Sequence, residues 1–369
     1  MDFIIQNKEQ KRRLFDFMAD KIYRASDFKV IKYLSLYNMC IRVIAFTPEV
    51  LTSMKQQLSY VLKDEAEHYD ATIVVFKEAH TETFLAEASE QLDLRKNRVL
   101  KVCTMWMKSF YVNIAESLHA NSVFMNIDGK AGLINAFDEE NRTVYYGVRD
   151  FTPEEFIKHG HVFIKALYRL NLLPNRNLVH GAAVGVNGVG ALLCARGQRG
   201  KSTLTVNALL NGFDYVADDY LLLDKENGEL FASPIYSIIT LNPKMYQKMY
   251  DDFKGKFVST NARFDKYVFN MAAYHTQFRE HYPIKVCLFP NICADKEPSI
   301  IPMDKGRGIA EMIHSTINQT NDDYNTQTVK KLLDFLKPFE FYQINLCIDI
   351  TKNTQCLYDF LTTFKGNKP

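Results

Sequence analysis

The sequence is poor in glycine, proline and tryptophan, with 16, 11 and 1 residues among 369. So little glycine and proline excludes collagen-like and low-complexity classes. Neither sign of charge is in large excess, because 45 basic and 43 acidic residues leave a formal net charge of +2. The composition therefore predicts no general attraction to nucleic acid or to an anionic membrane. Hydrophobic residues make up 47% and charged residues 24%, which is the balance of a globular protein and excludes wholesale disorder.

Cysteine patterns, signal sequences and long apolar runs are also missing. The seven cysteines show no CxxC pair and no zinc-ligand spacing, which is typical of reduced thiols in a cytoplasmic protein. The first residues form no apolar segment, so we expect no signal peptide. The most apolar stretch, 178–195, contains four glycines, His180 and Asn187, and this pattern indicates strands and turns rather than a membrane span.

The length predicts two domains. Residues 1–150 mix helical and strand patterns, so we expect an N-terminal α+β domain for recognition or assembly. Residues 31–46, for example, alternate apolar and polar side chains and predict strand. Residues 151–369 open with a capping box, Thr152-Pro153-Glu154-Glu155, and continue as alternating short strands, glycine turns and helices. This succession predicts an α/β catalytic domain, with a boundary between 150 and 175.

A phosphate-binding loop is the interpretation that residues 191–212 favour. Residues 191–194 predict a buried strand, residues 203–210 predict a helix, and Gly200-Lys201-Ser202 stands between them. Backbone N–H groups of such a loop and helix N-terminus bind phosphates, Lys201 would contact the β- and γ-phosphates, and Ser202 would bind Mg²⁺. The residues expected around ATP are Ala195, Arg196, Gly197, Gln198, Arg199, Gly200, Lys201, Ser202 and Thr203. An ordinary strand–turn–helix stays open as the alternative, because Ala195 replaces the first glycine of the GxxxxGK[ST] pattern.

Two adjacent carboxylates, Asp218 and Asp219, follow the next apolar segment. Neighbouring carboxylates repel each other and are disfavoured unless they are solvated or hold a cation. One interpretation is a solvated acidic turn. The other places one aspartate near the metal and lets the other accept a proton from a hydroxyl group.

His180 precedes the loop by one hairpin. A lone histidine is more often a core residue than a catalytic one. On a strand parallel to its neighbours, however, it would reach the bound phosphates.

These residues together resemble the catalytic domains of HPr kinase/phosphorylase. His180-Gly181, the loop with Gly200-Lys201-Ser202, and Val216-Ala217-Asp218-Asp219 are similar to that family in order and spacing, most of all to its divergent HPr kinase-like members. The resemblance implies a P-loop domain related to phosphoenolpyruvate carboxykinase that uses ATP and Mg²⁺. It also implies that His180, Lys201 and Asp218 are catalytic, with Asp218 as the proton acceptor, and that Ser202 helps to hold Mg²⁺.

The sequence departs from that family at several points. Ala195 and Gln198 replace glycines of the family loop, and residues 233–243 lack the carboxylate that ligates Mg²⁺ in the family. We therefore expect Asp219 to act as a metal ligand beside Ser202. The glycine-rich signature of true HPr kinases is also missing, which argues against HPr as the substrate and against the reverse phosphorylase reaction.

The sequence thus predicts a kinase that transfers the γ-phosphoryl group of ATP to a hydroxyl. The resemblance favours a serine of a protein or peptide, and a small-molecule alcohol stays open. A nucleotide-binding regulatory module without turnover is the main alternative, favoured by the altered loop and opposed by the retained Asp218. A decarboxylating enzyme like phosphoenolpyruvate carboxykinase lacks evident Mn²⁺ ligands. The resemblance also implies a homo-oligomer, for which no residue argues.

Overall fold

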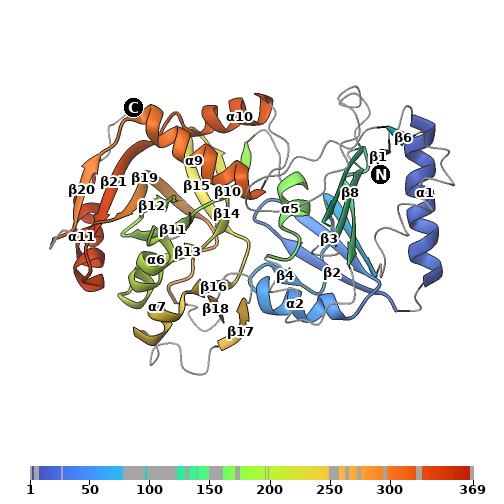
Figure 1. Cartoon of the computed structure of the whole chain (residues 1–369), viewed down its shortest axis with the longest axis horizontal. Helices are drawn as coiled ribbons and strands as arrows, with labels where there is room; N and C mark the ends of the chain where they lie inside the picture. Colours follow the sequence, from blue (N-terminus) through green and yellow to red (C-terminus); the bar gives the residue numbers. More distant parts are fainter. Residues whose placement is uncertain are drawn as a thin grey trace. The chain divides into compact units, whose positions relative to one another are not determined.

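The computed structural model is a mixed α/β protein with several sheets (Figure 1). It describes residues 2–3, 8–25, 28–77, 96–97, 123–128, 133–138, 140–148, 161–170, 175–195, 197, 199–248, 257–261, 266–271, 276–293, 297–320 and 326–365. The chain divides into two compact units, Met1–Lys55 with Leu62–Leu170, and Gln56–Val61 with Asn171–Pro369. The roles expected for the two domains stay predictions. No helix in these ranges is long and apolar enough to cross a membrane.

The first unit contains a seven-stranded sheet in the order β4-β2-β3-β5-β9-β8-β7. Strands β3, β5 and β9 run parallel, and the other neighbours are antiparallel. Residues 31–46, predicted as strand, form two strands of a hairpin, because Leu36 and Met39 exchange backbone hydrogen bonds and turn the chain. The elements are β1 (Asp2–Phe3), α1 (Lys8–Ala25), β2 (Val30–Ser35), β3 (Cys40–Ala45), α2 (Glu49–Gln57), β4 (Leu62–Lys63), β5 (Ala71–Lys77), β6 (Lys96–Asn97), β7 (Val123–Asp128), β8 (Leu133–Asp138), β9 (Thr143–Val148) and α5 (Ile164–Leu170).

The second unit contains a nine-stranded sheet in the order β10-β14-β15-β19-β12-β11-β13, with β21 paired to β19 and β20. Its first elements are β10 (Arg176–His180), β11 (Ala182–Val186), β12 (Val189–Leu193), α6 (Lys201–Leu210), β13 (Asp214–Ala217), β14 (Tyr220–Glu226), β15 (Glu229–Pro234), β16 (Ile238–Leu241) and α7 (Pro243–Lys248). The remaining elements are β17 (Phe257–Asn261), β18 (Lys266–Asn270), β19 (Tyr282–Ile292), β20 (Ser299–Pro302), α9 (Lys305–Thr320), α10 (Thr326–Leu336), β21 (Glu340–Leu346) and α11 (Ile350–Thr363). Strands β16, β17 and β18 form a separate sheet. Because β12, β19 and β21 run parallel, their carboxyl ends meet at one edge.

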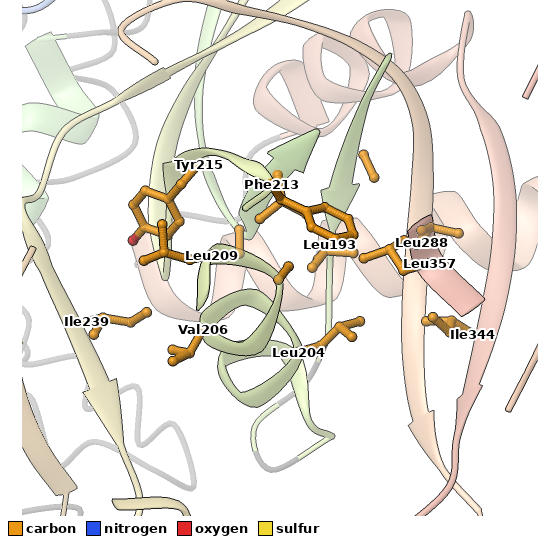
Figure 2. Packing of buried hydrophobic residues seen from close by; sticks show 14 of the residues in the cluster. Leu193, Leu204, Val206, Leu209, Phe213, Tyr215, Ile239, Leu288, Ile344 and Leu357 are labelled. Carbon is orange, nitrogen blue, oxygen red and sulfur yellow. The ribbon is translucent and has the colours of Figure 1, made fainter. Parts of the chain in front are cut away.

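Helices cover both faces of this sheet. Side chains alternate between the faces along each strand, so Leu193 and Leu192 of β12 belong to two different cores. Figure 2 shows the first core, in which Leu204 of α6 and Leu357 of α11 pack with Leu193. The second core contains Leu192 and Met312 of α9, together with residues of α10. This packing places the N-terminus of α6 close to the end of β12.

Two glycines of the β11–β12 hairpin make room for a tyrosine. A Cβ atom at Gly185 would lie 2.2 Å from Cε1 of Tyr282, and one at Gly190 would lie 2.2 Å from the backbone oxygen of Pro283. The Tyr282 hydroxyl accepts a hydrogen bond from the Gly188 N–H at 2.9 Å and donates one to an aspartate of β13 at 2.7 Å. The start of β19 is therefore bonded to both the hairpin and β13.

Candidate active site

The predicted strand–loop–helix is confirmed, with β12 followed by α6. Gly200 is the N-cap residue of α6 and has φ +93°, a left-handed conformation that glycine adopts readily. A Cβ atom there would lie 2.7 Å from Cδ1 of Leu346 at the end of β21, so a larger residue would also have to displace that side chain. The first N–H groups of an α-helix have no intrahelical acceptor and carry partial positive charge. The start of α6 thus offers donors for an anion at the carboxyl edge of β12.

The other residues of the predicted loop differ in how far they are exposed to solvent. Ala195 is buried, Gly197 is exposed, and Thr203 is half-buried within the first turn of α6. Arg199 is exposed and donates a hydrogen bond from Nη1 to Oδ1 of Asn291 at 2.9 Å. Arg196 and Gln198 lie outside the described residues.

Lys201 binds both predicted carboxylates. Its Nζ donates to Oδ1 of Asp218 and to Oδ1 of Asp219, each at 2.7 Å. The Lys201 and Asp218 side chains are only 8% and 1% exposed. Burial acts to lower the pKa of Lys201, but the two carboxylates outweigh it and raise the pKa above its usual value. The lysine is therefore a cation that links the helix start to the acidic pair.

One carboxylate oxygen of Asp218 is left without a partner. Its Oδ2 atom is buried and makes no hydrogen bond, while Oδ1 is bonded to Lys201. A buried acceptor without a donor is unfavourable, and a hydroxyl donor or a proton would relieve this. The arrangement fits the expectation that Asp218 accepts a proton from a hydroxyl group.

Asp219 lies at the bend between β13 and β14. It has φ +70°, which aspartate tolerates better than most residues with a side chain, and its carbonyl accepts a hydrogen bond from the Gly181 N–H at 2.9 Å. Non-glycine residues in this conformation cluster at functional sites. Its carboxylate is 16% exposed and faces both Lys201 and His180.

His180, the last residue of β10, joins the same group. Its Nε2 atom lies 3.7 Å from Oδ1 of Asp219, and the ring is almost fully buried. Burial lowers the pKa of His180, and the nearby Asp219 carboxylate acts in the opposite direction. The ring is therefore neutral near pH 7. The expectation of parallel strands around His180 is wrong, because β10 runs antiparallel to β14. The chain bend at Asp219 brings the histidine into place instead.

Ser315, Thr316 and Asn291 contact the site and were not expected from the sequence. The Ser315 Oγ lies 2.7 Å from Nδ1 of His180, and Thr316 Oγ1 accepts a hydrogen bond from the His180 N–H at 3.3 Å. The one signal in the sequence was a pair of polar residues three and four positions after Met312, a spacing that a helix would place on the same face as this methionine.

Ser202 and Asp219 are the expected Mg²⁺ ligands. Ser202 is half-buried, as the second residue of α6. No group of three or more histidine, cysteine, aspartate or glutamate residues within the described ranges is able to hold a metal ion. Mg²⁺ prefers oxygen ligands and is commonly bound by one or two protein groups together with phosphate oxygens and water. A hydroxyl and a carboxylate fit that chemistry.

No protein-family model and no curated protein sequence matches the chain. Among solved structures, the Hpr(Ser) kinase/phosphatase from Coxiella burnetii is similar with a TM-score of 0.30 and 13% sequence identity, over 52% of this chain and 99% of that one. A TM-score this low does not establish a shared fold.

Proposed function

We propose that the chain is an ATP- and Mg²⁺-dependent kinase of the HPr kinase-like type, which transfers the γ-phosphoryl group to a serine hydroxyl of a protein or peptide. One observation carries this proposal: Lys201, at the start of α6, contacts both Asp218 and Asp219 at 2.7 Å. A phosphate-binding cation and a proton acceptor are the two groups that phosphoryl transfer to a hydroxyl requires from the protein. The preference for serine comes from the sequence resemblance.

Each residue of the site has a separate role in the proposed reaction. The N–H groups at the start of α6 and the Lys201 ammonium hold the phosphates. Asp218 accepts the proton of the acceptor hydroxyl at Oδ2 as the oxygen forms a bond to the γ-phosphorus. The bond between the γ-phosphorus and the β,γ-bridging oxygen breaks, and ADP leaves with the electron pair. Mg²⁺ bound by Ser202 and Asp219 would neutralise charge on the phosphates.

The Lys201 contacts also suggest how nucleotide binding prepares the proton acceptor. Lys201 is hydrogen-bonded to both Asp218 and Asp219. Phosphate oxygens compete with the aspartates for the same three N–H donors of Lys201. We therefore expect a bound nucleotide to draw Lys201 away from Asp218 and to free the Oδ1 atom of this carboxylate, which favours binding of ATP before the hydroxyl acceptor.

The same contacts favour a second candidate, a nucleotide-binding regulatory module without turnover. In this structure both carboxylates are engaged by Lys201, and no third acidic side chain joins them within the described residues. Such a module needs phosphate contacts alone, so it predicts ATP binding that does not depend on Asp218.

The test compares the wild type with Asp218→Asn. ADP release from Mg·ATP is measured with and without a library of serine peptides, and ATP affinity is measured by calorimetry. A kinase predicts turnover that falls by roughly a hundredfold or more in Asp218→Asn, with ATP still bound. Asp334→Asn is the matched control, because Asp334 is an exposed carboxylate of α10 that pairs with Lys337.

The other outcomes separate the candidates. ATP binding without turnover in either protein favours the regulatory module. Absence of ATP binding in the wild type contradicts the phosphate-loop interpretation and both functions that depend on it.

A further inference from the structure

Helix α9 makes three buried hydrogen bonds to the candidate active site. Besides the contacts of Ser315 and Thr316 with His180, the Ser315 hydroxyl donates to the backbone oxygen of Ala195 at 3.1 Å. Ser315 is 3% exposed and Thr316 is 2% exposed. One side chain of α9 therefore contacts both the histidine and the first residue of the phosphate loop.

The hydroxyl of Ser315 has a single proton, which decides the protonation of the His180 ring. A carbonyl oxygen accepts and never donates, so the bond to Ala195 uses the serine proton. The 2.7 Å contact between Ser315 Oγ and His180 Nδ1 then requires a proton on Nδ1. In a neutral ring this leaves Nε2 with a lone pair.

The opposite tautomer fits the contacts less well. With the proton on Nε2, the nearest acceptor is Oδ1 of Asp219 at 3.7 Å, beyond the length of a hydrogen bond. Ser315 would then have to donate to Nδ1 of His180, which would leave the buried Ala195 oxygen without this donor. The charged and titratable groups that act on the ring are Asp218, Asp219 and Lys201, and the Tyr220 ring lies beside it, 5.4 Å between centroids.

We propose that Ser315 is a positioning residue that holds His180 as the Nδ1–H tautomer and directs the unprotonated Nε2 toward Asp219. An unprotonated Nε2 donates to neither aspartate, so the Oδ2 atom of Asp218 stays free to take the single proton of the acceptor hydroxyl. This role in the proton transfer rests on the proposed kinase function, whereas the tautomer does not. Because the same serine binds Ala195, it also couples the orientation of the ring to the position of the loop.

Nitrogen-15 NMR of the full-length protein, labelled at histidine, tests the tautomer. Two-bond proton–nitrogen correlations distinguish Nδ1–H from Nε2–H rings, and the signal lost in His180→Gln assigns His180. We expect Nδ1–H in the wild type and in Ser315→Thr, and a shift toward Nε2–H in Ser315→Ala. Ser233→Ala is the matched control, because Ser233 Oγ lies 3.0 Å from Nδ1 of His281. It should change the His281 signal alone.

Two results would overturn the proposal. One is a proton on Nε2 of His180 in the wild type, a result that is obtained without any serine variant. The other is an unchanged tautomer in a folded Ser315→Ala protein.

Kinetics then test the role in the proton transfer. In Ser315→Ala we expect kcat to fall by roughly ten- to a hundredfold, with ATP affinity unchanged within about twofold and with rescue by Ser315→Thr. An unchanged kcat in Ser315→Ala would refute the positioning role. If the wild type has no kinase activity but shows the expected tautomers, the proposed function fails and the assignment of Ser315 to the tautomer stands.

Discussion

Removing Lys201 should destabilise the protein far more than removing Asp218. The buried group contains one ammonium and two carboxylates, with a net charge of −1 when His180 is neutral. Lys201→Met leaves two adjacent carboxylates with a charge of −2. Asp218→Asn leaves one lysine and one aspartate, with no net charge. The two substitutions each delete one ionised group, yet they have opposite effects on the charge that stays buried.

The distances give the scale of the difference. At an effective dielectric constant of about 20, each 2.7 Å contact is worth about 6 kcal/mol of Coulomb attraction. Desolvation offsets much of this, and removal of one partner of a buried pair generally lowers the free energy of unfolding by about 3–5 kcal/mol. We expect that loss for Lys201→Met. Asp218→Asn keeps an acceptor for the lysine, so a loss of about 1–2 kcal/mol is expected.

Urea denaturation followed by circular dichroism measures both effects. With a slope of about 2–3 kcal/mol per molar urea, Lys201→Met should lower the midpoint by about 1–2.5 M and Asp218→Asn by less than about 1 M. The chain has two compact units, which need not unfold in a single urea transition. The midpoints are therefore compared for the transition that the substitutions shift. The double variant should be more stable than Lys201→Met alone. Equal losses in the two single variants, or a less stable double variant, would refute the argument from net charge.

Three further outcomes follow from particular residues. Gly200→Ala introduces a left-handed alanine, at a cost of about 1–2 kcal/mol, and should weaken Mg·ATP binding roughly tenfold by calorimetry. Gly185→Ala clashes with a tyrosine ring of β19 and should lower the free energy of unfolding by about 1–3 kcal/mol in urea. Burial lowers the pKa of His281 and of His180 in the folded chain. The free energy of unfolding should therefore decline below about pH 6.5, where the unfolded chain takes up protons more readily than the folded chain. His281→Gln should remove part of the decline in urea midpoint between about pH 7.5 and 5.5, and an unchanged decline would contradict this.

Local sequence patterns predicted the elements around the loop well. The strand before Ala195, the helix after Gly200 and the strand before Asp218 are all present as β12, α6 and β13. They are predictable because short apolar runs, glycines and a helical repeat act over a few neighbouring residues. The proximity of Lys201 to the two aspartates followed from the same local order, because β12 and β13 end at the same edge.

Contacts between distant segments were beyond prediction. Ser315 lies 135 positions after His180, and no periodicity of α9 indicates which strand its polar residues meet. The direction of β10 was also not predictable, since strand pairing depends on how the whole sheet is assembled rather than on residues 176–180. The candidate site was therefore foreseen as a set of loop and acidic residues, without the helix that fixes its histidine.

The contact between the hairpin and Tyr282 has an evolutionary consequence. No side chain fits at Gly185 while an aromatic ring occupies position 282, and the Pro283 backbone oxygen excludes a side chain at Gly190 whatever residue stands at 282. In relatives of this protein we expect glycine to be kept at 190, with a larger residue at 185 only where 282 is small. A glycine pair five residues apart, joined to a distant aromatic residue, would then help to recognise homologues whose overall sequences have diverged.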